Sequence, residues 1–345
     1  MLRLTWSAQE LRAAQALVAE VAALHPSAED PDFLNNACVY AQELPRRVRA
    51  FLNDFRVREP SAAACVISGY PVDDRKIGPT PAHWKWREDA ARSLEEQLLF
   101  VMLSSLVADA FGWVTQQDGH IIHDVFPIAG HEDRQLSTGS EQLIWWHTED
   151  AFHPFRGDYI GFLCLRNPAQ VATTMATLSL DRLTAGQIDT LFQPRFIIRP
   201  DESHQPANAS DPPAGGARAP GDYLAAAFEK INRMNVEGQK ISVFFGSPQS
   251  PYMSLDPYFM DSLDADPEAQ AALGALVQML DENLVEFVLQ PGDYCFIDNF
   301  RAVHGRKQFK ARHDGNDRWL KRLCLTRDLR KSRASRASAA SRVVC

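Results

Sequence analysis

Residues 144–152 read Ile-Trp-Trp-His-Thr-Glu-Asp-Ala-Phe, an apolar, strand-like run that leads directly into polar groups. His147 and Glu149 are two residues apart, so on an extended segment both side chains point to one face. An imidazole nitrogen and a carboxylate oxygen placed in this way can bind the same metal ion. A second pair with this spacing begins at His131, but its polar surroundings are typical of a solvated loop. The apolar wall beside His147 makes it the better candidate.

A third candidate ligand and two arginines follow far downstream. His304 comes after the strand-like run 293–299, and two histidines with one carboxylate form a facial triad that leaves three metal positions open, as non-haem Fe(II) oxygenases require. Arg318 and Arg322 lie 14 and 18 residues after His304, so both point to one face of a strand. An arginine there can pair with a carboxylate of 2-oxoglutarate. A structural histidine or a surface row of arginines is common, but the combination is far more specific.

From about residue 113 onward, short apolar or alternating runs are separated by turn residues, a pattern typical of a β-sandwich or barrel. Two helices, near 184–192 and 267–287, are expected to interrupt this β region. The expected strands are Ala64–Ser68, His120–Ile128, Gly161–Leu165, Phe196–Ile198, Ser242–Phe245, Asp293–Ile297 and Trp319–Leu325.

The first 112 residues are predicted to form a mainly helical scaffold. Ser7 and Glu10 have the spacing of a capping box and open the first helix. A strongly apolar helix is expected from Leu94 to Phe111, ending at Gly112.

The chain is expected to fold as a single catalytic domain over residues 1–330, with its β core at 113–330. The stretch 200–222 is rich in Pro, Ala and Gly and is long for a structureless loop, so we expect a lid or binding loop. Residues 331–345 are basic and of low complexity, and we expect a solvated tail that frays.

Composition narrows the class of protein. A chain of 345 residues, 45% hydrophobic and 23% charged, can bury a large core without disulfides. The net charge of −8 argues against nucleic acid and anionic membranes as partners. No apolar run is long enough for a membrane span, and the N-terminus lacks the apolar core of a signal peptide.

The absence of several known catalytic and metal-binding motifs argues against further classes of protein. The six cysteines form no CxxC pair. Serine-hydrolase, P-loop, Rossmann and HExxH motifs are absent from the sequence. We therefore expect a soluble protein of a reducing compartment, the cytoplasm, with a small-molecule substrate; the sequence leaves a homo-oligomer open.

Longer blocks carry a family resemblance. Trp146–Phe152, Asp158-Tyr159, Leu165–Pro168, Phe296–Lys307 and Arg318–Leu329 resemble the clavaminate synthase-like 2-oxoglutarate dioxygenases. The likeness is greatest to the bacterial hydroxylases of free basic amino acids, such as the arginine hydroxylase of viomycin biosynthesis, an antibiotic pathway. It covers most of the chain, from the region of Glu43 to Arg330. The resemblance implies an α+β fold with a mostly β core, a double-stranded β-helix (jelly roll), flanking helices and a lid insertion.

The resemblance also implies the cofactors and their ligands. Fe(II) would be bound by the three candidate ligands His147, Glu149 and His304, and O2 and 2-oxoglutarate would be cosubstrates. The far carboxylate of 2-oxoglutarate would pair with Arg318 and Arg322. The family pattern also places Thr174 beside the cosubstrate.

For the amino acid, Gln116 and Ser137 match positions that hold the α-amino and α-carboxylate groups. Glu149 would contact the α-amino group through its free oxygen. Asp201, at the start of the Pro- and Gly-rich stretch, matches a lid residue that binds the substrate side chain.

The sequence departs from the arginine hydroxylases at one segment. They carry two carboxylates in an Asp-x-Asp run that binds the guanidinium group, whereas this chain has Asp256-Pro257-Tyr258. A guanidinium group prefers paired, fork-like acceptors, while a lysine ammonium group is a compact point charge. Asp201, Asp256 and the Tyr258 hydroxyl would satisfy it, so we expect lysine in preference to arginine or ornithine.

The expected reaction is hydroxylation of an unactivated side-chain carbon, C3 or C4, of a free basic L-amino acid. Two alternatives remain at this point. One is a desaturase or cyclase that uses the same iron chemistry. The other is a metal-free jelly-roll module that only binds an amino acid.

Overall fold

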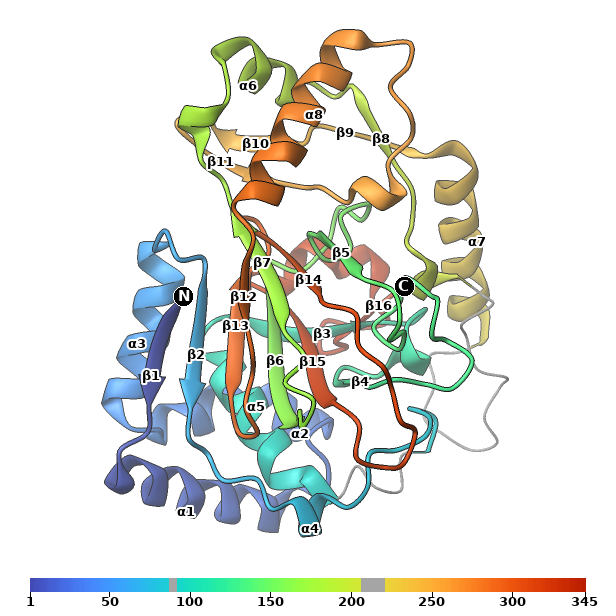
Figure 1. Cartoon of the computed structure of the whole chain (residues 1–345). Helices are drawn as coiled ribbons and strands as arrows, with labels where there is room; N and C mark the ends of the chain where they lie inside the picture. The colour runs from blue at the N-terminus through green and yellow to red at the C-terminus, as the bar shows by residue number, and fades with distance from the viewer. Residues whose placement is uncertain (87–91, 206–220) are drawn as a thin grey trace.

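The computed structural model describes residues 1–86, 92–205 and 221–345, and its centre is a large mixed sheet (Figure 1). Helices and strands both contribute heavily, so the fold is mixed α+β, as expected. In sheet order the strands are β1 (Leu2–Thr5), β2 (Ala64–Ser68), β13 (Tyr294–Asp298), β6 (Tyr159–Arg166), β15 (Trp319–Thr326), β3 (Asp109–Trp113) and β16 (Val343–Val344), with β4 (His123–Val125) also paired with β15.

A smaller sheet of four strands packs against the large one. Its strands, in order, are β12 (Val285–Phe287), β7 (Thr173–Thr177), β14 (Ala302–Arg306) and β5 (Ile144–His147). Apolar side chains from both sheets meet between them, including Phe162, Met175 and Leu320. Two facing sheets with a shared apolar interior are the arrangement expected for a jelly roll.

A layer of helices covers the outer face of the large sheet (Figure 1). The layer contains α1 (Ala8–Leu24), α2 (Pro31–Tyr40), α3 (Arg46–Arg58), α4 (Asp74–Ile77) and α5 (Leu94–Ser105). The predicted capping box is confirmed, since Ser7 and Glu10 each bond to the other's backbone N–H. α5 lies so close to β6 that a side chain at Gly161 would come within 3.1 Å of the Phe100 ring. Strand β6, covered on both faces, is buried along its whole length.

Two predicted helices end earlier than expected. The apolar helix from residue 94 stops at Ser105, and Asp109–Trp113 forms β3, because its backbone pairs with β15 on one side and β16 on the other. The helix predicted over 267–287 ends at Glu282, and Val285–Phe287 pairs with β7. In both places hydrogen bonding to a distant strand decides the structure, and local periodicity does not report it.

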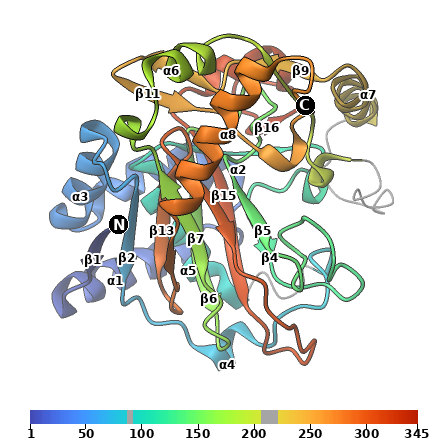
Figure 2. The ribbon, with the colours of Figure 1, turned by 45° about the horizontal axis from the view of Figure 1, so that its top comes forward.

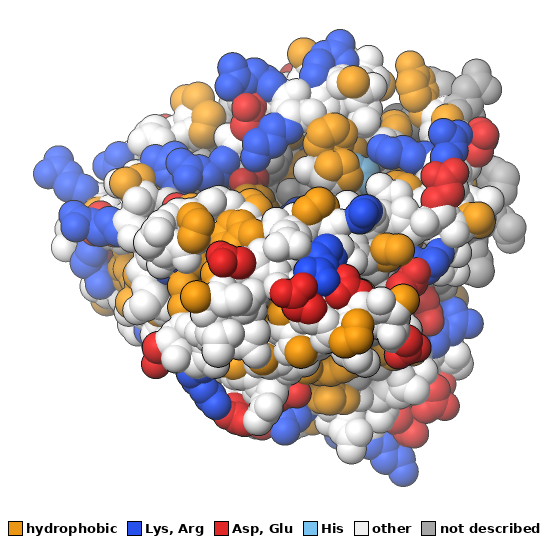
Figure 3. Space-filling view, turned by 90° about the horizontal axis from the view of Figure 1, so that it is seen from above, with side chains coloured by type: hydrophobic (Ala, Val, Ile, Leu, Met, Phe, Trp, Pro, Cys, Tyr) orange, Lys and Arg blue, Asp and Glu red, His pale blue; other side chains and the backbone are white. Residues whose placement is uncertain are grey.

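An outer layer lies over the smaller sheet (Figure 2). It contains α6 (Ala185–Leu191), α7 (Gly221–Glu237), α8 (Pro267–Glu282), the antiparallel pair β8 (Phe196–Ile198) and β9 (Gln239–Ile241), and the hairpin β10 (Phe244–Ser247)–β11 (Ser250–Met253). Trp146 of β5 joins this layer, because its ring packs with Leu276 and Leu280 and its Nε1 donates to Asp281 Oδ1 at 2.7 Å. From above, charges of both signs and apolar side chains are mixed on this layer (Figure 3).

Short 3-10 helices shape the connections: η1 (Ala41–Glu43), η3 (Gln117–Gly119), η4 (Leu180–Arg182), η5 (Glu202–His204), η7 (Pro257–Phe259) and η8 (Leu329–Ser335). Most of the lid predicted at 200–222 lies outside the described residues. Within the described ranges, no helix combines the length and apolar character needed to cross a membrane.

The expectation of a frayed C-terminal tail is wrong. The Arg336 guanidinium is buried and donates to the carbonyls of Leu329 and Ala339, both at 2.8 Å. Val343–Val344 then pairs in parallel with β3, and Val344 is buried beside Phe111. Low complexity did not reveal this, because the segment is ordered by hydrogen bonds and burial that other parts of the chain supply.

Candidate active site

The three candidate metal ligands meet inside the cavity between the two sheets. β14 and β5 run antiparallel with His304 directly opposite His147. Glu149 Oε2 lies 3.7 Å from His147 Nε2 and 3.4 Å from His304 Nε2. One ligand atom from each residue lies within 4.8 Å of the others. The structure therefore brings together the residues that the sequence placed 155 positions apart.

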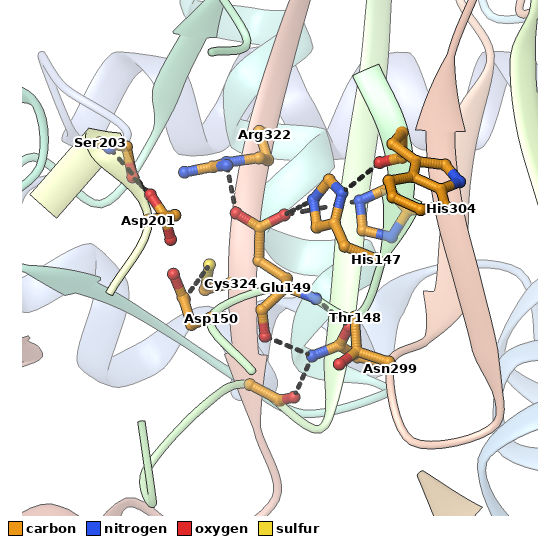
Figure 4. A network of polar contacts seen from close by, with 12 residues as sticks. His147, Thr148, Glu149, Asp150, Asp201, Ser203, Asn299, His304, Arg322 and Cys324 are labelled. Carbon is orange, nitrogen blue, oxygen red and sulfur yellow. Dashed lines mark hydrogen bonds and ion pairs between the residues drawn. The ribbon is translucent and has the colours of Figure 1, made fainter. Parts of the chain in front are cut away.

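The backbone around Glu149 is fixed by side chains from neighbouring loops. Asn299 Oδ1 accepts from the Glu149 N–H at 2.7 Å, and Asn299 Nδ2 donates to the Glu149 carbonyl at 3.1 Å. Thr148 Oγ1 accepts from the Leu255 N–H at 3.0 Å. These bonds hold the turn that follows β5, in which the Glu149 carboxylate points toward the rings of His147 and His304 (Figure 4).

The surroundings shift the pKa values of the two histidines in opposite directions. His147 Nδ1 lies 2.9 Å from the Trp145 carbonyl, so Nε2 is the nitrogen that faces Glu149. Burial opposes a charge on His147, but the contact with Glu149 and the charge of Asp256 raise its pKa to about 9. Burial lowers the pKa of the His304 imidazole. Two imidazoles and one carboxylate on one side of a cavity fit a divalent transition metal with open positions.

The two predicted arginines differ in their surroundings. Arg322 donates to Glu149 Oε1 and to Gln116 Oε1, the latter at 3.2 Å, and this contact with Glu149 raises its pKa despite burial. Arg318 is 6% exposed, and no described residue forms an ion pair with it or accepts from its Nε. Burial lowers the pKa of Arg318 to about 10.

A third arginine, Arg306, lies beside Arg318 and was missed by the sequence argument. It is 4% exposed and also lines the cavity, and burial together with the charge of Arg318 lowers its pKa to about 9. Neither guanidinium group has a carboxylate partner among the described residues. The Arg306 guanidinium donates to the carbonyls of Gly139 and Gln142, so Arg318 is the group of the two that is open to a carboxylate, and Arg306 adds positive charge beside it. In the sequence, the only indication that Arg306 lies at the site was its position two residues after His304.

Thr174, predicted beside the cosubstrate, follows a second threonine, Thr173, on β7. Thr173 lines the cavity, whereas Thr174 does not and lies on the opposite face of β7. A one-residue shift moves a side chain to the other face of a strand. The pairing of β7 with β14, which places Met175 opposite His304, decides which threonine faces inward.

The residues predicted to bind the amino acid line the same cavity, which has a volume of about 330 Å³. Small-molecule sites commonly have volumes of a few hundred Å³. Arg318, Arg306 and Thr173 line this cavity together with the residues predicted to bind the amino acid, Gln116, Ser137, Asp201, Asp256 and Tyr258. Figure 4 shows Glu149 between the two histidines and Arg322, with Asp201 beyond Arg322.

Two acidic residues, Asp256 and Asp201, line the cavity. Burial raises the pKa of Asp256 to about 6; His147 opposes this rise and the charge of Asp201 adds to it. Tyr258, in contrast, is 50% exposed. Two carboxylates from different elements therefore contribute to one electrostatic environment, although Asp256 and Asp201 are far apart in the sequence.

Further polar residues, which contact the residues that line the cavity, were not predicted from the sequence. His123 Nδ1 lies 2.8 Å from the Arg322 guanidinium, and Ser203 accepts from Gln116 Nε2 at 2.6 Å. His204 and Asp150 form a buried pair at 2.9 Å. A lone histidine in an apolar or loop segment gives no local signal of such contacts.

Comparisons with known proteins agree with this geometry. The sequence model of the family described as "Taurine catabolism dioxygenase TauD, TfdA family" matches residues 231–324. The L-ornithine/L-arginine 3-hydroxylase of Catenulispora acidiphila is 44% identical over 345 residues, with all of both chains covered. The enduracididine beta-hydroxylase of Streptomyces hygroscopicus is 41% identical over 351 residues, again with 100% coverage of both.

A solved structure and a more distant relative complete the comparison. The non-heme iron oxygenase OrfP, in complex with Fe, succinate and (3S)-hydroxy-L-Arg, superposes with a TM-score of 0.93 at 44% identity over 100% of both chains. The same oxygenase has been solved with Fe and alpha-ketoglutaric acid. The L-lysine 3-hydroxylase of Catenulispora acidiphila is only 28% identical, over 93% of this chain and 83% of its own length.

These matches bear directly on the expectations from sequence. The predicted family is confirmed, and the neighbours support a jelly roll. With relatives above 40% identity along its whole length, the chain belongs to the TauD/TfdA family of dioxygenases, in its clavaminate synthase-like branch, and is a non-haem Fe(II)- and 2-oxoglutarate-dependent oxygenase.

Proposed function

We propose that the chain hydroxylates carbon 3 of free L-arginine or L-ornithine, with Fe(II), O2 and 2-oxoglutarate. The observation that carries the proposal is one cavity that the three candidate metal ligands share with two buried guanidinium groups, Arg318 and Arg306, and with two carboxylates, Asp201 and Asp256. A dicarboxylate cosubstrate matches the guanidinium groups, and an amino acid with a cationic side chain matches the carboxylates. The names of the two relatives above 40% identity, a 3-hydroxylase and a beta-hydroxylase, support C3 in preference to C4.

The expectation of lysine in preference to arginine is not supported. It rested on Tyr258 in place of a second carboxylate, but that side chain is half exposed. Asp201 supplies a second acid beside Asp256 from another element, and two carboxylates can accept the paired donors of a guanidinium group. The lysine hydroxylase is also much less similar to this chain than the arginine and ornithine enzyme.

In cosubstrate binding, Arg318 and Arg306 have different roles. Arg318 pairs with the far carboxylate of 2-oxoglutarate, because it is buried, cavity-facing and without an acidic partner among the described residues. Arg306 adds a second positive charge beside it, and Thr173 takes the place that the sequence gave to Thr174. With this assignment, Arg322 has no part in binding the cosubstrate.

The amino-acid side is built around Arg322. Its guanidinium already contacts Glu149 and Gln116, and it points away from the two histidines (Figure 4). We assign it to the substrate α-carboxylate, together with Ser137. Gln116 and the Oε1 side of Glu149 face the α-amino group. The side chain then extends toward Asp201 and Asp256.

His147, Glu149 and His304 would hold the iron. The chemistry that such a centre supplies is oxygen activation: one oxygen atom enters a substrate C–H bond, and 2-oxoglutarate leaves as succinate and CO2. The protein's own part is to orient the amino acid, so that one carbon lies toward the metal ligands, and to exclude water from the cavity. Arg322 keeps Glu149 Oε1 occupied, so Oε2 is the oxygen that faces the histidines.

The test is incubation of the enzyme with Fe(II), 2-oxoglutarate and ascorbate, separately with each of the twenty amino acids and with ornithine. Mass spectrometry should show a gain of one oxygen with arginine or ornithine, and NMR should place it on C3. A loss of two hydrogens would identify a desaturase. No turnover of any basic amino acid, or a clear preference for lysine, would overturn the proposal.

A further inference from the structure

A buried polar network lies behind the amino-acid side of the cavity, and His204 is at its centre. The His204 side chain is 1% exposed. Its Nδ1 lies 2.7 Å from Thr115 Oγ1, and its Nε2 lies 2.9 Å from Asp150 Oδ1 and 3.0 Å from Gln116 Nε2. No step of the proposed reaction uses this imidazole. A buried ring with three polar contacts fixes the positions of the groups around it.

In one direction the network reaches the metal ligands. Asp150 directly follows Glu149, and its backbone has a φ of 51°, in the left-handed region that residues other than glycine seldom adopt. Trp113 Nε1 donates to Asp150 Oδ2 at 2.6 Å, while Oδ1 faces His204. Both carboxylate oxygens are therefore engaged, and these contacts hold the unusual backbone next to Glu149.

In the other direction the network reaches the acid that faces the substrate. Asp201 Oδ1 accepts from the Ser203 N–H at 2.8 Å, so residues 201–204 form one tight turn. Gln116 Nε2 donates to Ser203 Oγ at 2.6 Å. His204 ends this turn and anchors it to the protein interior. The position of Asp201 over the cavity thus depends on the burial of His204.

We infer that His204 is a positioning residue that joins the turn carrying Asp201 to the loop carrying Glu149. The inference rests on the proposed function, in which Asp201 binds the substrate side chain. The far end of the amino acid and the metal ligand then keep a constant separation, so the same carbon faces the metal at every turnover. A misplacement of about 1 Å can cost on the order of a hundredfold in rate.

His204→Leu tests the inference, because it removes both ring nitrogens and keeps an apolar side chain of similar volume. We expect the KM for the amino acid to rise about tenfold, the effect of one lost hydrogen bond in a buried site. The fraction of 2-oxoglutarate turnover that yields hydroxylated product should fall. The affinity for 2-oxoglutarate, measured without O2 by the charge-transfer absorption of its Fe(II) complex, should stay within about twofold, because Arg318 is not part of the network.

Two further variants separate positioning from folding. His204→Gln keeps an amide near the Nε2 position and should restore part of the coupling. Thr115→Val removes only the Nδ1 contact and should give a smaller change in the same direction. His120→Leu is the matched control, since His120 also pairs with a carboxylate, that of Glu29 at 2.6 Å, but does not line the cavity.

An unchanged KM and unchanged coupling in His204→Leu would overturn the inference. So would loss of the charge-transfer absorption in both His204 variants, because that would mean a purely structural role at the metal loop. If His204→Leu does not fold, His204→Gln and Thr115→Val decide. All variants are compared on whichever amino acid the wild-type enzyme hydroxylates, so failure of the proposed function appears in the wild type alone.

Discussion

Arg322 and Glu149 form a buried ion pair in which the guanidinium group contacts one carboxylate oxygen, Oε1, and the other, Oε2, faces the two histidines. A single carboxylate therefore lies between the metal side and the amino-acid side of the cavity. Arg318, four residues earlier and just before β15 begins, has no such partner among the described residues. The two arginines should consequently respond differently to substitution.

Arg318→Gln should raise the KM for 2-oxoglutarate by roughly a hundredfold and leave the KM for the amino acid nearly unchanged, because removing one member of a buried charge pair costs about 2–5 kcal/mol. Arg322→Gln should instead raise the KM for the amino acid. Steady-state kinetics with each substrate varied in turn checks both. Arg312→Gln, at a half-exposed position outside the cavity, is the control. If both substitutions raise the KM for 2-oxoglutarate equally, Arg322 also binds the cosubstrate.

His304→Ala should abolish hydroxylation without lowering the melting temperature, because its ring faces an open cavity and its Nδ1 has no hydrogen-bond partner among the described residues. Iron binding, measured by metal analysis after gel filtration, should fall in parallel. Treatment of the wild-type enzyme with a chelator should remove activity, and Fe(II) should restore it. His313→Ala, on an exposed loop, should keep full activity. Substantial turnover by His304→Ala would show that the three candidate ligands are wrongly assigned.

Asp256→Asn should lower kcat/KM for arginine and ornithine by roughly a hundredfold, since it removes one acceptor charge from the end of a buried site. Neutral amino acids, if they bind at all, should be affected less. Asp264→Asn is a matched substitution at an exposed position and should behave like the wild type. A decrease of less than about threefold in Asp256→Asn would mean that Asp201 alone reads the side-chain terminus.

The pH dependence of kcat/KM should reflect the ionisation of Asp256. Binding of a cationic side chain needs Asp256 ionised, and its pKa is raised to about 6, so kcat/KM should fall as the pH drops through about 6. The effect on stability has the opposite direction. A carboxyl group whose pKa is raised by folding favours the folded state at low pH and loses that contribution as the pH rises toward 6. Asp256→Asn should therefore remove the acid limb of the kinetic profile and raise the melting temperature at pH 8 more than at pH 4.

The C-terminal strand should contribute to stability. Val344→Asp places a charge among Phe111, Trp113 and Cys324, and burial of an unpaired charge should lower the free energy of unfolding by about 3 kcal/mol or more. Thermal or denaturant unfolding measures this. Ala340→Asp, an exposed position in the same segment, should have little effect. Equal stability of the two variants would mean that the tail frays in solution.

Much of the metal site was readable from the sequence because its signals are local. The spacing of His147 and Glu149 places both on one face of an extended segment, whatever the rest of the chain does. Capping residues marked the first helix, and alternating runs marked β2, β8 and β15 close to their observed ends. The long family blocks, which keep their residue order, supplied the third candidate ligand, His304.

Local sequence patterns could not assign different roles to Arg318 and Arg322, and they could not show whether Thr173 or Thr174 faces the cavity. The even spacing of Arg318 and Arg322 predicts the same role for both, but β15 begins at Trp319 with a register irregularity before Leu320, and only Arg322 contacts Glu149. The choice of Thr173 over Thr174 follows from the register between β7 and β14. Register is a property of a strand pair, and neither strand encodes it alone.

The substrate and the network around His204 were decided by the tertiary structure. The proposed guanidinium substrate needs two acceptors in one place, and Asp201 and Asp256, which different loops bring to the same cavity, are the proposed pair. His204 meets Asp150 across 54 positions of sequence, in a contact that neither segment announces. The sequence by itself determined which chemical groups this chain carries and the class of reaction they suit. The folded chain decided which of those groups share a low-dielectric space, because electrostatic interaction depends on distance in space and not along the chain.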